Sequence, residues 1–421
     1  MTQAILPSFV HANDPEWLNA ARRLARERIQ DIGLPTAEEE EWRYSRIDDL
    51  DLSDFTPVEA KSEHSPMWGL VDGEAIADAV ATIDVVDGFV VAVDVSADVE
   101  DLVEISTDGV GAEDALGSVM TEPTDSFADM SLVLADRPIV IRIAPDAVVE
   151  GPIVVRHRVV TAGSLTATRI VVIAGQNSEA TVIEAQSCDE IQAVILPVTE
   201  LRVERAARLK YLVVQDLAHS VWQIGTQVST IDADAHLVTS AVALGGYYAR
   251  LRCDTRMIGK GAEGDIKAVF FGQDAQALDF RTFQTHVAPH TNSDLVFKGA
   301  LDGHARSIYT GLIRIEKDAY AVEAFQTNRN IKLSEHAWAE SVPNLEIENN
   351  DVQCSHASAV GPIDADQQFY LESRGVPTQV AERLVVQGFF SEIVSQMPHA
   401  GVAAAVDAEL TRRLQTSEFV R

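Results

Sequence analysis

Short runs of β-branched residues separated by polar turns fill the middle of this chain, from about residue 138 to residue 361. Such runs are typical of β-strands. No segment at helical spacing lies between them, so a doubly wound sheet, which needs helical crossovers, is not expected. The clearest runs cover residues 139–143, 153–155, 170–173 and 181–184.

The turns between these runs recur at a period of roughly 28 residues, with centres near Asn177, Ala206, Ala233 and Ala262. A constant period favours a β-helix, in which each coil lies on the previous one, whereas a β-sandwich or barrel needs no fixed period. A stretch from about residue 274 to residue 304 is predicted to interrupt the period. On the residues alone, the β-sandwich stays open as the alternative.

The N-terminal part begins with a predicted helix. Asp14 is expected to cap it, Pro15 suits its first position, and apolar residues recur at helical spacing up to Ile29. We interpret its arginine-rich face as solvated, with a partner surface as the alternative. The acidic run 38–41 before Trp42 predicts a helix start with an aromatic anchor, within an N-terminal α/β cap. The arginines are Arg22, Arg23, Arg26 and Arg28.

The C-terminal part is predicted to be helical. Asp364 can cap a short helix that ends at Gly375. A second helix is expected from Pro377 to about Met397, and a third over residues 402–414, with apolar residues along one stripe of the second.

Between the β region and these helices, residues 345–356 alternate apolar and polar positions around a polar turn at 348–351. Residues two apart on a strand share a face, so Cys354 and His356 are predicted to project side by side. Thiolate and imidazole suit a soft metal such as iron or zinc, and both residues are candidate metal ligands. Two ligands do not complete a four-coordinate site, and a half-buried cysteine beside a hydrogen-bonded histidine is the competing interpretation.

Gly259, Gly261 and Gly264 match the Gly-x-Gly-x-x-Gly spacing of dinucleotide-binding loops. Such a loop must open a helix, whereas residues 265–270 alternate like a strand, so a hairpin or coil turn is predicted. The chain contains neither a Gly-x-x-x-x-Gly-Lys-Ser/Thr sequence nor a Gly-x-Ser-x-Gly elbow. No catalytic motif is therefore identified, and any ATP dependence must come from a partner.

His286 and His290 have the i, i+4 spacing of metal-binding helices, but Pro289 argues against a helix there. They are predicted to be loop histidines, with a role in shaping or gating a surface as the alternative. Cys188 and Cys253 have no His or acidic constellation beside them beyond the aspartate that follows each, and are predicted to be buried or bystander thiols.

The composition is that of a folded, soluble protein: 421 residues, 46% of them hydrophobic, with a mean hydropathy of +0.02. A formal net charge of −32 argues against a nucleic-acid partner. No apolar run reaches the roughly eighteen residues that span a bilayer, and the N-terminus lacks a signal pattern. Three widely spaced cysteines indicate a reducing cytoplasm rather than a disulfide framework.

The segment NLEIENNDVQCSHASAVGPIDADQQFYLESRG, with AFQTNRNIKLSEHAWAESVP before it, closely resembles the C-terminal core of the SufB/SufD family of iron–sulfur cluster assembly proteins. Glu-Glu-Trp-Arg-Tyr-Ser at 40–45 resembles a segment typical of the SufD branch. The resemblance covers essentially the whole chain and is strongest from about Gly259 onward. Where the family commonly has Cys-Ser-His-Gly, this chain has Ala357, whose Cβ excludes a glycine-only backbone conformation.

The resemblance implies a mainly β fold: a parallel, right-handed β-helix core (138–361) between an N-terminal helical and α/β cap (1–137) and a C-terminal helical domain (362–421). It implies a non-catalytic scaffold subunit of the SufBCD complex, which assembles iron–sulfur clusters with ATP. A β-helix edge would pair with SufB, and the C-terminal helices would bind the ATPase SufC. A transient cluster would form at the SufB interface, with His356 as a nitrogen ligand and Cys354 as a supporting thiolate.

Other interpretations stay open. A SufB-like paralogue should carry additional cysteines, and a stand-alone β-helix enzyme acting on carbohydrate is disfavoured by the charge and the missing signal pattern. A structural adaptor without a metal role is a further alternative. A flavin in the assembled complex and a homodimer of the isolated chain are also left open.

Overall fold

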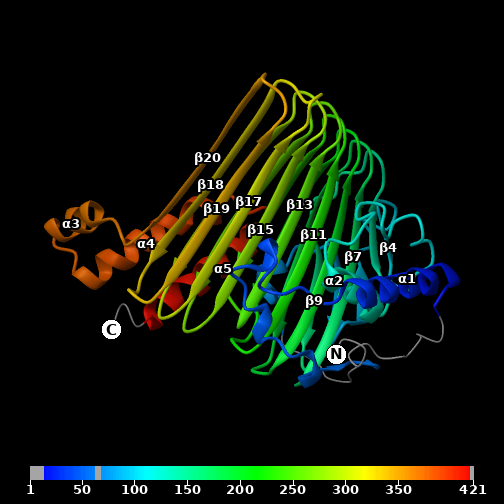
Figure 1. The fold of residues 1–421 in the computed structure, drawn as a ribbon, viewed down its shortest axis with the longest axis horizontal. Coiled ribbons are helices and arrows are strands. Elements are labelled where there is room, and N and C mark those ends of the chain that lie inside the picture. Colours follow the sequence, from blue (N-terminus) through cyan, green and yellow to red (C-terminus); the bar gives the residue numbers. More distant parts are fainter. Residues whose placement is uncertain (1–13, 62–67, 418–421) are drawn as a thin grey trace.

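The computed structural model describes residues 14–61 and 68–417. Its centre is a parallel β-solenoid of two sheets, and successive strands pass alternately from one sheet to the other (Figure 1). Hydrogen bonds join each strand to the strand two further along the chain, so every coil adds one strand to both sheets. The predicted parallel β-helix is confirmed, and the β-sandwich is excluded because the ladders are parallel.

The first sheet, sheet A, consists of β4 (Val103–Ser106), β5 (Ile139–Ile143), β7 (Ser164–Ala174), β9 (Ala193–Val203), β11 (Trp222–Ile231), β13 (Tyr248–Met257), β15 (Ala277–His286), β17 (Arg306–Ile315) and β19 (Trp338–Ile347), with β1 (Thr56–Pro57) beside β7. Sheet B consists of β3 (Phe89–Val95), β2 (Ala81–Val86), β6 (Ile153–Val159), β8 (Glu179–Cys188), β10 (Arg208–Asp216), β12 (His236–Ala243), β14 (Glu263–Gly272), β16 (Asn292–Leu301), β18 (Val322–Lys332) and β20 (Val352–Gly361). The α-helices are α1 (Glu16–Ile32), α2 (Ser126–Leu134), α3 (Ala365–Ser373), α4 (Thr378–Val394) and α5 (Ala400–Thr416).

One side of the solenoid is formed by turns whose central residue has left-handed backbone dihedrals. In three successive coils this residue has a φ of 57° at Asn177, 57° at Ala206 and 58° at Asp234. Its N–H donates to a carbonyl of the next coil, for example from Asn177 to Arg205 (2.9 Å), which ties the turns into a ladder. The ladder continues through Gly261, His290 and Ala321.

The predicted interruption of the period between residues 274 and 304 is wrong. These residues form another regular coil, because β15 pairs over its full length with β13 and β17, and β16 pairs with β14 and β18. The turn of this coil has His290 at the left-handed position, where the preceding coils have a small or short polar residue. The change of residue type hid the repeat.

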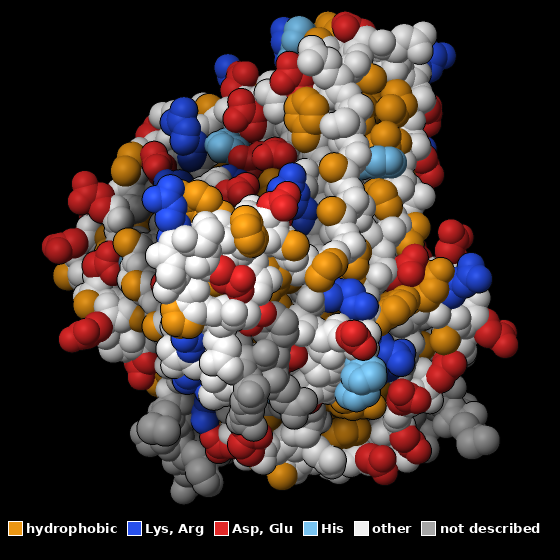
Figure 2. Space-filling model, turned by 90° about the vertical axis from the view of Figure 1, so that its left-hand side faces the viewer, with side chains coloured by type: hydrophobic (Ala, Val, Ile, Leu, Met, Phe, Trp, Pro, Cys, Tyr) orange, Lys and Arg blue, Asp and Glu red, His pale blue; other side chains and the backbone are white. Residues whose placement is uncertain are grey.

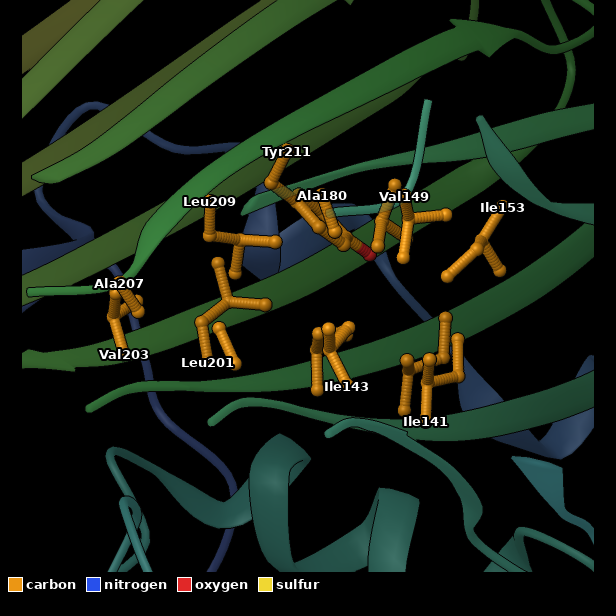
Figure 3. Close-up of a cluster of buried hydrophobic side chains, with 14 of the residues drawn as sticks. Ile141, Ile143, Val149, Ile153, Ala180, Leu201, Val203, Ala207, Leu209 and Tyr211 are labelled. Carbon is orange, nitrogen blue, oxygen red and sulfur yellow. The ribbon is translucent and has the colours of Figure 1, made fainter. Parts of the chain in front are cut away.

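Apolar side chains from both sheets fill the space between them. Burial of each such side chain stabilises the fold by about 1.5–3 kcal/mol, and the packing fixes one coil on the next. In the part of this core shown in Figure 3, sheet A contributes Ile141, Ile143, Leu201 and Val203, and sheet B contributes Ile153, Ala180, Leu209 and Tyr211.

Helices α1 and α2 pack against each other, and α2 packs on the outer face of sheet A at β7 and β9. The residue at the cap position of α1 is Pro15, and the carboxylate of Asp14, the predicted cap, pairs with Arg22 instead. Arg22 is buried and also donates to the carbonyl oxygen of Ala135 (2.6 Å).

The interpretation of the arginine-rich face as solvated is therefore wrong for Arg22, and Arg28 is partly withdrawn from solvent because it pairs with Asp129 of α2. Trp42 lies in a short 3-10 helix (Glu40–Trp42) and is buried, so the predicted aromatic anchor is confirmed.

Three helices follow β20, as predicted. Helix α4 packs on the outer face of sheet B at β14 and β16, and α5 packs on α4. Helix α3 is capped by the side chain of Asp364, has no buried residue and stands away from the solenoid (Figure 1). No helix in the described parts of the chain is long and apolar enough to cross a bilayer.

The two ends of the solenoid differ. At the N-terminal end, the antiparallel strands β3 and β4 close the sheets. At the C-terminal end, β19 and β20 are the last strands, and nothing within residues 14–61 and 68–417 pairs with their outer edges. Strands β2, β3 and β4 lie in the same sheets as the solenoid, and the domain limits at residues 137 and 361 stay predictions.

Candidate functional site

Strand β20 carries both candidate metal ligands. It pairs in parallel with β18, with Cys354 opposite Ala324 and His356 opposite Gln326. Ala324 and Gln326 are buried in the solenoid, and register partners on neighbouring parallel strands point to the same face. Cys354 and His356 therefore project from the inner face of β20, about 6.6 Å apart along the strand.

No further coil covers these two side chains within the described parts of the chain. Cys354 is half-buried against the apolar cluster of the preceding coil, which includes Ile313 and Val322, while His356 is exposed. Figure 2 looks onto this end of the molecule, and uncharged and hydrophobic side chains predominate in the strip at its upper right. The interior of the solenoid is thus open where Cys354 and His356 lie.

One register position of the interior changes from apolar to polar in the last two coils. Phe297 of β16 is followed in register by Asn328 of β18 and then by Ser358 of β20. The amide of Asn328 donates to the hydroxyl of Ser341 on β19 (3.0 Å). Burial of an amide is costly unless it is hydrogen-bonded, and this bond offsets the cost for Asn328. This register position therefore presents polar groups toward the open end of the solenoid.

Gln326, Asn328 and Asn330 also belong to this region, which the sequence alone did not indicate. All three are buried on the inner face of β18, but polar residues at alternating strand positions are ordinarily assigned to solvent. The sequence feature that could have indicated an inward-facing side is Ala324, a small apolar residue two positions before Gln326 and therefore on the same face of the strand.

Cys354 can bind a metal ion only after its thiol has lost a proton. Burial raises the pKa of Cys354, so the isolated chain holds a protonated thiol at neutral pH, and a bound metal would displace that proton. His356 offers an imidazole nitrogen. Across the residues that the structure describes, no three Cys, His or acidic side chains are placed to hold a metal ion. The pair by itself supplies two of the four ligands of a tetrahedral site.

The other predicted histidines behave differently from each other. His286 is the last residue of β15 and fully buried, and its ring nitrogens hydrogen-bond to the hydroxyls of Thr291 (2.7 Å) and Ser293 (3.0 Å). The prediction of a loop residue is wrong for His286, whose burial lowers its pKa to about 4. His290 lies in a turn, as predicted, with its ring against that of Tyr320.

The remaining cysteines lie away from β20. Cys253 is buried, and its burial raises the thiol pKa to about 12. Cys188 is partly buried and accepts a hydrogen bond from the N–H of Ala218 (3.0 Å), and burial raises its pKa to about 11. Thiols of such high pKa are poor nucleophiles and poor metal ligands. The glycine motif at 259–264 leads into β14, as predicted, and not into a helix.

A groove of about 1140 Å³ lies between the end of the solenoid and helices α3 and α4. The ammonium of Lys298 pairs there with Glu392 and lies 4.8 Å from the ring centroid of Phe389. Tyr370 and Leu384 line the groove with exposed apolar surface. Exposed apolar side chains next to a groove are typical of surfaces that bind another protein.

Residues 157–389 match the protein family described as SUF system FeS cluster assembly, SufBD core domain. The matched segment is more than half of the chain and includes both strands of the terminal coil.

Individual relatives agree with this match. The chain is 36% identical over 227 residues to an iron–sulfur cluster assembly SufBD family protein of Mycobacterium tuberculosis, covering 52% of this chain and 57% of that protein. It is 35% identical over 161 residues to SufD of Bacillus subtilis (38% and 37% covered) and 30% identical over 181 residues to SufD of Escherichia coli (43% and 43%). The chain therefore spans between 37% and 57% of the length of these relatives.

Proposed function

The chain belongs to the SufBD family of iron–sulfur cluster assembly proteins, and from this membership we propose that it is a non-catalytic scaffold subunit for ATP-dependent cluster assembly. Its partners in this role would be SufB and the ATPase SufC. Three cysteines without disulfide bonds support a reducing compartment, the cytoplasm.

The open terminal coil is the observation that carries this proposal. Strands β19 and β20 present two edges of ten residues each that no described strand covers. An exposed edge is a template for pairing with another chain. The SufB solenoid would pair with these edges and cover the apolar side chains beside them, namely Phe325, Trp338, Ile347 and Val360.

The iron–sulfur cluster, which is the cargo of assembly, would form at this interface. His356 would supply a nitrogen ligand and Cys354 a thiolate, and residues of SufB would complete the site. A site shared between two subunits opens when they move apart, which suits a cluster that has to be passed on.

The C-terminal helices would bind SufC. Helix α3 has no buried residue, and Phe369 exposes 71% of its surface on it. The chain has no phosphate-binding loop of its own, so ATP would be hydrolysed by the partner. Dimerisation of SufC on the helices of both scaffold subunits would then move the two terminal coils relative to each other.

Co-purification of the full chain with SufB and SufC, followed by anaerobic cluster reconstitution, tests this proposal. Wild type is compared with His356→Ala and with His304→Ala, a matched control because His304 is also exposed but lies in the turn between β16 and β17. The complex should form in all three cases, and only His356→Ala should fail to build a cluster. Equal clusters in all three would make His356 structural, and no complex with wild type would refute the scaffold role.

A further inference from the structure

Gln326 lies directly beneath His356 in the interior of the solenoid. The two residues are register partners on β18 and β20, whose backbones run about 4.8 Å apart. The Gln326 side chain is buried, and its amide oxygen Oε1 has no hydrogen-bond partner among the described residues. A buried oxygen without a donor destabilises the fold, and its retention requires an explanation.

The amide of Gln326 lies close to Gly311 and Tyr309 of β17. A Cβ at Gly311 on β17 would lie 2.5 Å from Gln326 Nε2 and 2.7 Å from Oε1, so a larger residue would displace the side chain. The hydroxyl of Tyr309 also lies 2.5 Å from the position of this Cβ. The missing side chain at Gly311 therefore makes room for an amide one layer below the open end.

This amide oxygen can accept a hydrogen bond from the ring N–H of His356. A neutral imidazole carries one N–H donor and one unprotonated nitrogen. A histidine that binds a metal through one nitrogen generally donates its other N–H to a carbonyl or carboxylate oxygen, which fixes the tautomer and the direction of the ring.

We propose that Gln326 is the positioning residue of His356. Its Oε1 accepts the ring N–H after a rotation of the imidazole about its side-chain torsions, and this bond holds the other ring nitrogen toward the open end of the solenoid. The proposal rests on the proposed function of His356 as a ligand and adds the residue that prepares it for that role.

Asn330 supplies a matched comparison within the same strand. It is also buried on the inner face of β18, and its Oδ1 has no partner among the described residues. Its register partner on β20 is Val360, which has no side-chain donor. Asn330 thus shares the burial and the unpartnered oxygen of Gln326 but has no histidine above it.

Nitrogen-15 NMR of the full chain, labelled in its histidine rings, tests the proposal. The His356 signals are assigned by their loss in His356→Ala. Wild type should show one dominant His356 tautomer, and Gln326→Leu should convert it to the mixture seen for a free imidazole. Asn330→Leu should leave the tautomer unchanged, and Gln326→Glu, which keeps an acceptor oxygen, should preserve it.

A mixed His356 tautomer in wild type, or a tautomer that Gln326→Leu does not change, would overturn the inference. A second readout is the rate at which a chelator removes the reconstituted cluster from the complex. Gln326→Leu should accelerate this loss about 10–100-fold, the usual effect of removing such a partner, and Asn330→Leu should not. If His356→Ala leaves the cluster intact, the proposed function fails; if only Gln326→Leu is without effect on tautomer and cluster, the positioning role alone fails.

Discussion

The Cζ of Arg250 lies 3.8 Å from the ring centroid of Trp42, which joins the middle of the solenoid to the N-terminal segment. Arg250 is buried on β13 and pairs with Asp279 of β15 (2.9 Å). Two residues after Trp42, the ring of Tyr44 contacts Trp338, the first residue of β19, with 6.1 Å between ring centroids. The N-terminal segment therefore packs against the outer face of sheet A from β13 to β19.

Replacing Trp42 by alanine should lower the free energy of unfolding by about 3–5 kcal/mol, because it leaves a cavity and uncovers a buried guanidinium. Trp338→Ala is the control, since Trp338 is 37% exposed, and it should cost about 1 kcal/mol or less. Urea unfolding of the isolated chain, followed by circular dichroism, measures both. Equal shifts of the two midpoints would show that Trp42 does not anchor the segment.

His286 makes stability dependent on pH. Its burial lowers its pKa from the usual 6.5 to about 4, so the folded state keeps the ring neutral while the unfolded chain takes up a proton. The contribution is complete above about pH 6.5 and is lost as the pH falls toward 4. Since each pH unit in this interval is worth about 1.4 kcal/mol, the total is about 3 kcal/mol.

His286→Gln should remove this part of the pH dependence, and His304→Gln, at an exposed turn, should not. Unfolding free energies of wild type and both variants, measured between pH 4 and pH 7.5, test this expectation. A His286→Gln profile parallel to that of wild type would contradict the assignment.

The three thiols should differ in reactivity. Burial raises the pKa of all three thiols, to about 11 for Cys188 and to about 12 for Cys253, but Cys354 is only half-buried and lies beside solvent. Iodoacetamide at pH 8 should modify Cys354 first and Cys253 only after unfolding, because the thiolate is the reactive form. Mass spectrometry of peptides over time gives the order. In the complex with SufB, Cys354 should become protected, and continued rapid alkylation there would place the interface elsewhere.

The elements that sequence reasoning predicted correctly are those specified by local patterns. Turn residues at one spacing favoured the solenoid, which the family resemblance then selected over a β-sandwich, and apolar stripes predicted α1 and α4. The placement of Cys354 and His356 on one face also followed from a two-residue alternation. Each of these signals lies within one element or repeats from coil to coil, so no tertiary contact was needed to detect it.

The errors concern contacts between distant segments. Burial of Arg22 depends on the carbonyl oxygen of Ala135, more than a hundred residues away, which an amphipathic helix pattern cannot reveal. The coil between residues 274 and 304 was missed because its left-handed turn residue is His290, and histidine is not a usual marker of such turns. The inner position of Gln326 depends on the strand register. Polar residues at alternating positions are ordinarily assigned to the solvent-facing side of a strand, which is the wrong side for Gln326.

Electron–nuclear double resonance of the reduced, reconstituted complex tests the central claim most directly, with nitrogen-15 histidine introduced into this chain alone. A nitrogen coupling to the cluster that is present in wild type and absent in His356→Ala is the predicted result, since it would place His356 on the cluster at a shared interface. A cluster with no nitrogen coupling from this chain, or a coupling that persists in His356→Ala, would contradict the claim.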